Sequence, residues 1–197
     1  MAESFTELLK TLVAPIAILI TWWLTKRTQD QQKHREMIAA WHQLLIEITQ
    51  CQERMRGIAI SEVKAPLYRL PTDAYKLQFP TLMIVSNMDP EEIDAFQRYY
   101  QFIDQLNQGL DLAAEAAQTH DAAALKKHFD RNRTKAKQLV DEEGTQGSLY
   151  DRARAAVFAQ LERLGDKRYV EWIKKKQRVG EKIEEPDEGA TKRQPTP

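Results

Sequence analysis

The side chains best suited to metal binding or acid–base chemistry are the four histidines, which fall into two pairs. His34 and His42 are eight residues apart, and so are His120 and His128. On a helix this spacing separates the partners by about 12 Å along the axis. Two histidines that share one metal ion on a helix normally lie three or four residues apart. Neither pair can therefore hold an ion by itself, and we expect solvated or half-buried histidines and no metal site.

The other groups that could support catalysis lack the neighbours that catalysis needs. The four serines and the seven glycines form neither a G-x-S-x-G nucleophile motif nor a phosphate-binding loop. Cys51 is the only cysteine, so no internal disulfide can form, and a small core residue is favoured over a nucleophile. The sequence thus predicts no catalytic residue and no cofactor. An enzyme whose site is assembled from scattered residues is the less favoured alternative.

Two basic stretches could contact an anionic partner. One contains Lys126, Lys127, Arg131, Arg133, Lys135 and Lys137, and the other contains Lys167, Arg168, Lys174, Lys175, Lys176 and Arg178. Such stretches suit the headgroups of anionic lipids or the phosphates of nucleic acid. An ordinary solvated helix face is an equally good interpretation. The chain as a whole has 29 acidic and 29 basic residues, so its net charge creates no general attraction to nucleic acid.

The chain begins with a mostly apolar segment. The run from Thr11 to Leu24 carries no charge, and its extension back to Phe5 meets only Glu7 and Lys10. Twenty helical residues are about 30 Å long, which is the thickness of the hydrocarbon core of a bilayer. The sequence therefore predicts a transmembrane helix over residues 5–25, after a short extracytoplasmic N-terminus of residues 1–4.

Both ends of this segment carry side chains typical of a membrane–water interface. Trp22 and Trp23 are followed by Lys26 and Arg27, and Lys10 lies near the other end. The excess of basic residues after the segment predicts a single-pass protein of the cell (inner) membrane, with the N-terminus outside and the remaining domain in the cytoplasm. A cleaved signal peptide, a buried core helix and an interfacial helix are less favoured alternatives.

The next segment, residues 26–60, has the spacing of a long helix with one apolar face. Apolar side chains recur at alternating intervals of four and three residues, at Met37, Trp41, Leu44, Ile48, Cys51, Met55 and Ile58. A seam of this kind can form a parallel coiled coil between two chains. Because Ile38, Leu45 and Ala59 widen the seam, packing inside a bundle of the same chain is favoured.

Residues 61–180 supply the rest of the predicted bundle. This part begins with a proline-containing connection over residues 61–72. Thr72 is expected to cap a short helix. Pro80 should interrupt this helix and begin a further helical turn. Asp89, followed by a proline and two glutamates, is the clearest helix start in the chain.

Three further helices and a tail complete the predicted chain. One helix is expected over residues 121–143, and a second begins at Ser148, which has an aspartate three residues later as in a capping box. A third, short helix over residues 167–178 should bury Tyr169, Val170, Trp172 and Ile173 if it docks on the bundle. Residues 181–197 are polar and proline-containing, so we expect them to be disordered.

Together these features predict an all-α protein: a single N-terminal transmembrane helix, an antiparallel helical bundle, and a disordered C-terminal tail. The expected core contains Trp41, Leu44, Ile48, Phe96 and Tyr100. We expect a non-enzymatic, membrane-anchored interaction module that contacts the lipid bilayer and binds a protein partner or a second copy of the chain. The alternative is a membrane-acting effector whose helical domain senses a signal and drives oligomerisation of the anchor helices. Anionic lipid and nucleic acid are further candidate partners for the basic stretches.

Overall fold

The structure, a computed structural model, describes residues 2–60, 69–143, 147–167, 169–173 and 175, and the side chains among them from residue 15 onward. Within these ranges the regular elements are five helices, and no strand occurs: α1 (Ala2–Ile60), α2 (Asp73–Val85), α3 (Pro90–Gln118), α4 (Ala122–Asp141) and α5 (Leu149–Arg163). The all-α class is therefore confirmed for the described part of the chain. The predicted tail, residues 181–197, lies outside the described residues.

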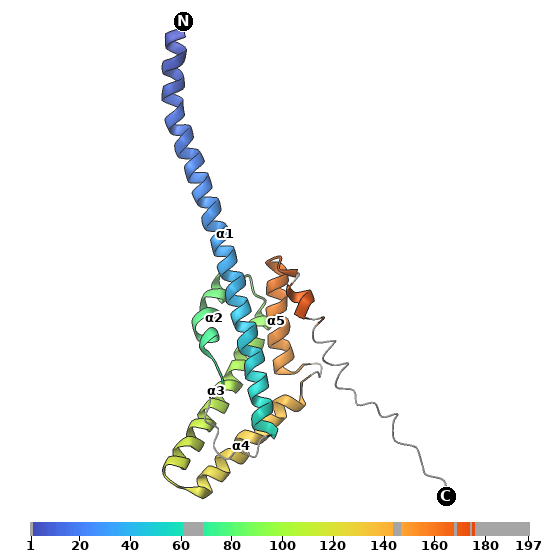
Figure 1. Ribbon diagram of the computed structural model, residues 1–197. Coiled ribbons are helices and arrows are strands. Elements are labelled where there is room, and N and C mark those ends of the chain that lie inside the picture. Colours follow the sequence, from blue (N-terminus) through green and yellow to red (C-terminus); the bar gives the residue numbers. More distant parts are fainter. Residues whose placement is uncertain (1, 61–68, 144–146, 168, 174, 176–197) are drawn as a thin grey trace, which may run out of the picture.

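The helix α1 belongs to the bundle only with its C-terminal half, and its N-terminal half projects away from the other helices (Figure 1). Every side chain from residue 15 to residue 36 is exposed, and the first buried one belongs to Ala40. Pro15 lies inside the helix without ending it. The expected membrane segment and the expected juxtamembrane helix are thus two parts of one rigid rod.

The transmembrane helix that the sequence predicts is not supported by the described residues. In that part of the chain, no helix offers a stretch both long enough and apolar enough to cross a bilayer. Residues 5–14 of the predicted segment lie outside the residues whose side chains are described.

The apolar seam of α1, defined by Trp41, Leu44, Ile48, Cys51, Met55 and Ile58, is buried against the other helices of the same chain. All six side chains are at most 4% exposed. The seam is therefore occupied within the chain, as the bundle interpretation predicts, and is not free to pair with a second copy as a coiled coil. Burial also raises the pKa of the Cys51 thiol well above its usual value, which agrees with a core residue.

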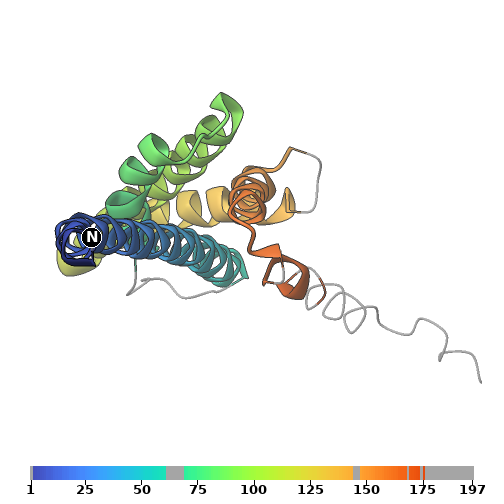
Figure 2. The same ribbon diagram turned by 90° about the horizontal axis from the view of Figure 1, so that it is seen from above.

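The remaining helices pack against this half of α1 and against one another, and they leave one face of it exposed. Helices α3 and α4 pack along each other as a hairpin, while α5 packs on α3 and on α1. Figure 2, seen from the N-terminal end, shows α2 on one side of α1. Four of the five core residues expected from the sequence are completely buried, and the fifth, Tyr100, is 1% exposed.

The helix starts predicted from local signals are confirmed. At the start of α3 the Glu92 side chain accepts the backbone N–H of Asp89 at 3.1 Å. At the start of α5 the Ser148 hydroxyl accepts the N–H of Asp151 at 3.1 Å, and Asp121 caps α4 in the same way. These bonds satisfy donors that have no partner within the first turn of a helix.

Two expectations about α2 are wrong. Pro80 does not interrupt the helix, which continues to Val85. Proline removes one backbone hydrogen bond, whereas continuing the helix past Pro80 buries Leu82 on the same face as Phe79. Thr72 occupies the capping position, but its side chain makes no capping hydrogen bond.

The start of α2 is capped instead by a carboxylate from α1. Glu47, which is 5% exposed, accepts the backbone N–H groups of Ala74 at 2.6 Å and of Tyr75 at 3.0 Å. It also accepts the hydroxyl of Tyr100 at 2.8 Å, and the ring of Tyr100 stacks on that of Tyr75 at 3.9 Å. A buried carboxylate is stable only when such donors replace water. One side chain therefore joins α1, α2 and α3.

Shortening a seam residue should destabilise the bundle strongly. The Leu44 side chain is fully buried, so Leu44→Ala is expected to lower the free energy of unfolding by about 2–5 kcal/mol. Ile46→Ala, on the half-exposed side of the same helical turn, should cost about 1 kcal/mol or less. Urea denaturation followed by circular dichroism measures both, and equal losses would contradict this placement of the core.

The two adjacent tyrosines of α3 provide a matched test of the Glu47 cluster. Tyr100 donates to a carboxylate, whereas Tyr99 donates to the Ile48 carbonyl at 3.2 Å. Tyr100→Phe should therefore cost about 1.5–3 kcal/mol of stability and Tyr99→Phe about 0.5–1.5 kcal/mol. The comparison of denaturation midpoints checks the order, and a larger loss at Tyr99 would show that the carboxylate is not the principal acceptor.

Candidate functional site: the projecting part of α1

The projecting half of α1 carries a group of large apolar side chains that the bundle does not cover. We call residues 16–24 the apolar arm. Its aliphatic side chains Ile16, Ile18, Leu19, Ile20 and Leu24 are between 50% and 69% exposed. Exposed apolar surface of this continuity on a folded protein marks a place where another apolar surface binds.

The apolar arm is apolar around its whole circumference. Successive residues of an α-helix are rotated by about 100° around its axis, because a turn contains about 3.6 residues. Ile18, Leu19 and Ile20 therefore point in three different directions, and each is more than half exposed. The apolar arm thus differs from an amphipathic helix, whose apolar side chains share one face.

The hydroxyl groups of the apolar arm and of the residues that follow it are satisfied within the helix. Thr21 donates to the carbonyl of Ala17 at 2.8 Å, and Thr25 donates to that of Thr21 at the same distance. Thr28 donates to the carbonyl of Leu24 at 2.9 Å. No external partner is required by these three polar groups, so they do not oppose transfer of the helix into an apolar environment.

The C-terminal end of the apolar arm combines aromatic and basic side chains. The Lys26 ammonium lies 5.2 Å from the ring centre of Trp22, and the Arg27 guanidinium lies 5.3 Å from that of Trp23. Such cation–π pairs hold the charges against the rings while leaving them hydrated. The structure thus brings four predicted interface residues together. The side chain of the fifth, Lys10, lies outside the described ones.

A polar part of α1 separates the apolar arm from the bundle. Residues 25–36 are all exposed and include an i,i+4 hydrogen bond from Gln32 to Glu36 at 2.9 Å. Twelve helical residues are about 18 Å long. Because the helix is continuous, this spacer fixes the distance between the apolar arm and the bundle.

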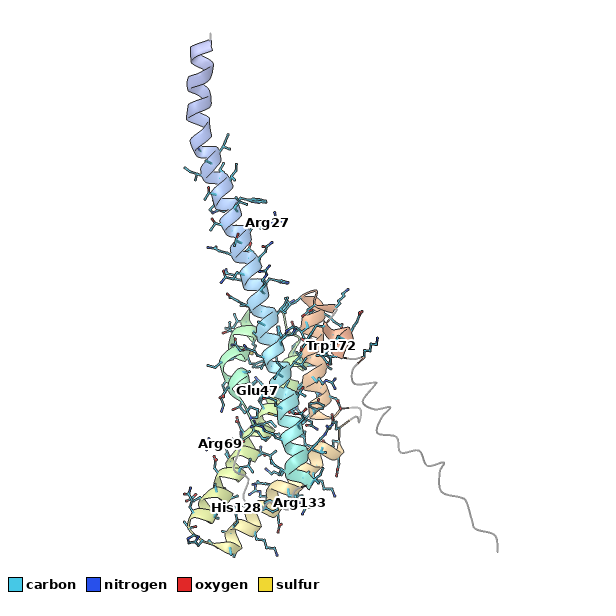
Figure 3. All side chains as sticks on the ribbon, viewed as in Figure 1. Arg27, Glu47, Arg69, His128, Arg133 and Trp172 are labelled. Atoms are coloured by element: carbon cyan, nitrogen blue, oxygen red, sulfur yellow. The ribbon has the colours of Figure 1, made fainter. Side chains whose placement is uncertain are left out.

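Residues that follow α5 pack against α1 just beyond the spacer, next to His42. His42 Nε2 lies 2.8 Å from the Asp166 carboxylate, and its ring lies 4.0 Å from that of Tyr169. Within the predicted segment 167–178, Val170 is buried as expected, whereas Trp172 is 56% exposed, so its expected burial is wrong (Figure 3). The half-buried state expected for His42 is confirmed, and the pairing with Asp166 is an additional finding.

The predicted anion-binding residues are not brought together with the apolar arm. Lys126 and Lys127 are exposed on α4, and Lys175 is exposed near the end of the described chain. Figure 3 places Arg133 and His128 at the end of the bundle opposite the apolar arm. Of the remaining candidates, Arg131 lies on the same helix, and Lys174 and Lys176 lie outside the described residues.

Arg133 has a role within the fold. Its Nε donates to the carbonyl of Ala59 at 3.1 Å, in the last turn of α1. That turn has no basic residue of its own, so a cation from α4 meets the negative end of the α1 dipole. Arg133 is therefore a helix-capping residue, and its contact with an external anion stays a prediction.

Two buried polar residues were not identified from the sequence, although their positions in the helical repeat could have revealed them. Glu47 lies three residues after Leu44 and four before Cys51, on the side of the seam. Asn132 similarly lies four residues before Ala136 on the apolar face of α4, and it is 3% exposed. A polar residue at an apolar position of a helical repeat marks a specific partner, because burial without one is unfavourable.

Comparison with known proteins gives no further guide to the role of the apolar arm. No protein family model, no curated protein and no solved structure matches the chain. Its function has to be argued from the geometry of the apolar arm and the bundle.

Replacing Arg133 should affect stability in a way that replacing a neighbouring lysine does not. Arg133→Gln is expected to lower the free energy of unfolding by about 1 kcal/mol, because the last turn of α1 loses its charged donor. Lys127→Gln on the exposed face should change it by about 0.5 kcal/mol or less. Chemical denaturation of both variants checks this, and equal effects would refute the capping role.

Proposed function

We propose that the chain is a non-enzymatic, membrane-anchored interaction module. In this proposal the apolar arm lies in a bilayer, and the helical bundle stands at the membrane surface and binds a partner. The single observation that supports it most is the exposure of the apolar arm on every side. The cytoplasmic side is proposed for the bundle, because Lys26, Arg27, Lys33 and Arg35 follow the apolar arm.

The energetic argument rests on the aliphatic side chains. Full burial of one such side chain is worth about 1.5–3 kcal/mol, so covering the exposed half of each yields about 1 kcal/mol. The five aliphatic residues of the apolar arm would together contribute roughly 5 kcal/mol. This gain is available wherever water is removed from the whole helix surface.

A bilayer fits this requirement better than a single protein partner does. A partner that packs on one side of a helix covers one face and leaves the opposite side chains in water. Lipid surrounds a helix completely, and the aromatic and basic residues at the end of the apolar arm match the interfacial zone of a membrane. The internally bonded threonines support the same environment.

Vesicle flotation tests the proposal with the full chain. Wild-type protein should float with phosphatidylcholine vesicles in a density gradient. The double variant Ile18→Lys/Leu19→Lys should remain in the aqueous fraction, because two lysines near the centre of the segment cost about 5–7 kcal/mol, more than the apolar arm gains. The matched control Gln29→Lys/Gln31→Lys adds the same charge to the exposed spacer and should float like the wild type.

The flotation experiment has clear contrary outcomes. Wild-type protein that stays in the aqueous fraction, or a lysine double variant of the apolar arm that still floats, would refute the membrane anchor. The variants should have the denaturation midpoint of the wild type, because residues 15–36 are exposed and contribute nothing to the core. Release of trapped dye from the vesicles by the wild type, but not by the lysine variant, would favour the alternative function, a membrane-acting effector, over the interaction module.

A further inference from the structure

A small cavity lies between α3 and α4, at the end of the bundle opposite the apolar arm (Figure 3). Its volume is about 150 Å³, and it is lined by Gln105, Gly109, His128, Arg131, Asn132 and Lys135, among others. Liquid water occupies about 30 Å³ per molecule, so the cavity has room for one small polar group of several heavy atoms.

One residue of the cavity lining, Asn132, carries a buried hydrogen-bond donor without an acceptor. Asn132 is 3% exposed, and its Nδ2 group makes no hydrogen bond with any described residue. A buried amide that lacks a partner costs about 1–3 kcal/mol, so it calls for an explanation such as a bound water, ion or ligand. Gly109 makes room for this side chain, because a Cβ at residue 109 would lie 2.0 Å from Asn132 Oδ1.

The lining of the cavity is basic and includes no carboxylate. Arg131 makes no ion pair with any described residue. Lys135 donates to the neutral Gln105 side chain at 3.0 Å, and His128 is half-buried beside them. The lining of one small space therefore includes two unneutralised cations and a residue with an unpaired amide donor. This combination is complementary to a compact dianion.

We propose that this cavity binds the phosphate group of a small phosphorylated molecule. The Asn132 amide donates to one phosphate oxygen, and Arg131 and Lys135 neutralise the two charges. Asn132 Nδ2 is not accessible to solvent. The ligand therefore enters when the flexible Lys135 side chain gives up its hydrogen bond to Gln105 and binds the phosphate. The position opposite the apolar arm favours a dissolved molecule over a headgroup of the bilayer that the arm would enter.

Titration calorimetry with inorganic phosphate and with glycerol 3-phosphate, on the full chain in a non-ionic detergent, tests this site. Arg131→Gln should weaken binding by about tenfold, since it removes one charge-assisted contact from an exposed position. Asn132→Asp should abolish binding, because a carboxylate would face the phosphate. Lys126→Gln, on the same helix but outside the cavity, should leave the affinity within about twofold of the wild type.

Nuclear magnetic resonance of the Asn132 side-chain amide provides a second readout that does not depend on the stability of the variants. Its two proton signals should shift as phosphate is added to the wild type and stay in place with chloride at equal ionic strength. Absence of phosphate binding, or equal weakening by Lys126→Gln and Arg131→Gln, would overturn the proposal. Tight binding of single-stranded RNA without competition by phosphate would also overturn it, because a surface for nucleic acid would then explain the charges.

Discussion

The structure depends on one constraint, the burial of the apolar seam of α1 by the other helices. Six seam side chains from Trp41 to Ile58 are nearly or completely inaccessible, and α2, α4 and α5 all pack on this helix. Because α1 continues without a break from Ala2 to Ile60, the packing of its C-terminal half also determines where its N-terminal half points. The apolar arm is thus held away from the bundle by the continuity of the helix.

Polar side chains determine how the helices pack against one another. Glu47 of α1 caps the start of α2, where Thr72 makes no capping hydrogen bond, and it accepts a hydrogen bond from the Tyr100 hydroxyl of α3. Arg133 of α4 supplies the positive charge that the last turn of α1 lacks. In both cases a helix end is satisfied by a side chain from another helix, so the caps also join the helices. Buried polar bonds of this kind favour one arrangement over alternatives of similar apolar content.

The two proposals concern opposite ends of the molecule and depend on different physics. The proposed membrane anchor depends on apolar area that is exposed around a whole helix, whereas the proposed phosphate site depends on a few directed charges and one unpaired amide. A rigid rod between them would hold the cavity at a defined distance from a membrane.

The sequence by itself determined the features that arise from neighbours along the chain. The seam, the starts of α3 and α5 and the burial of Trp41, Phe96 and Tyr100 follow from helical periodicity and from side chains within one turn of each other. Only the tertiary structure decided the partners of Glu47 and Arg133, which come from other helices; Arg133, for example, lies 74 residues from Ala59. Periodicity identifies the face on which a residue lies, but the residue opposite depends on how separate helices pack, and no spacing within a single helix encodes that choice.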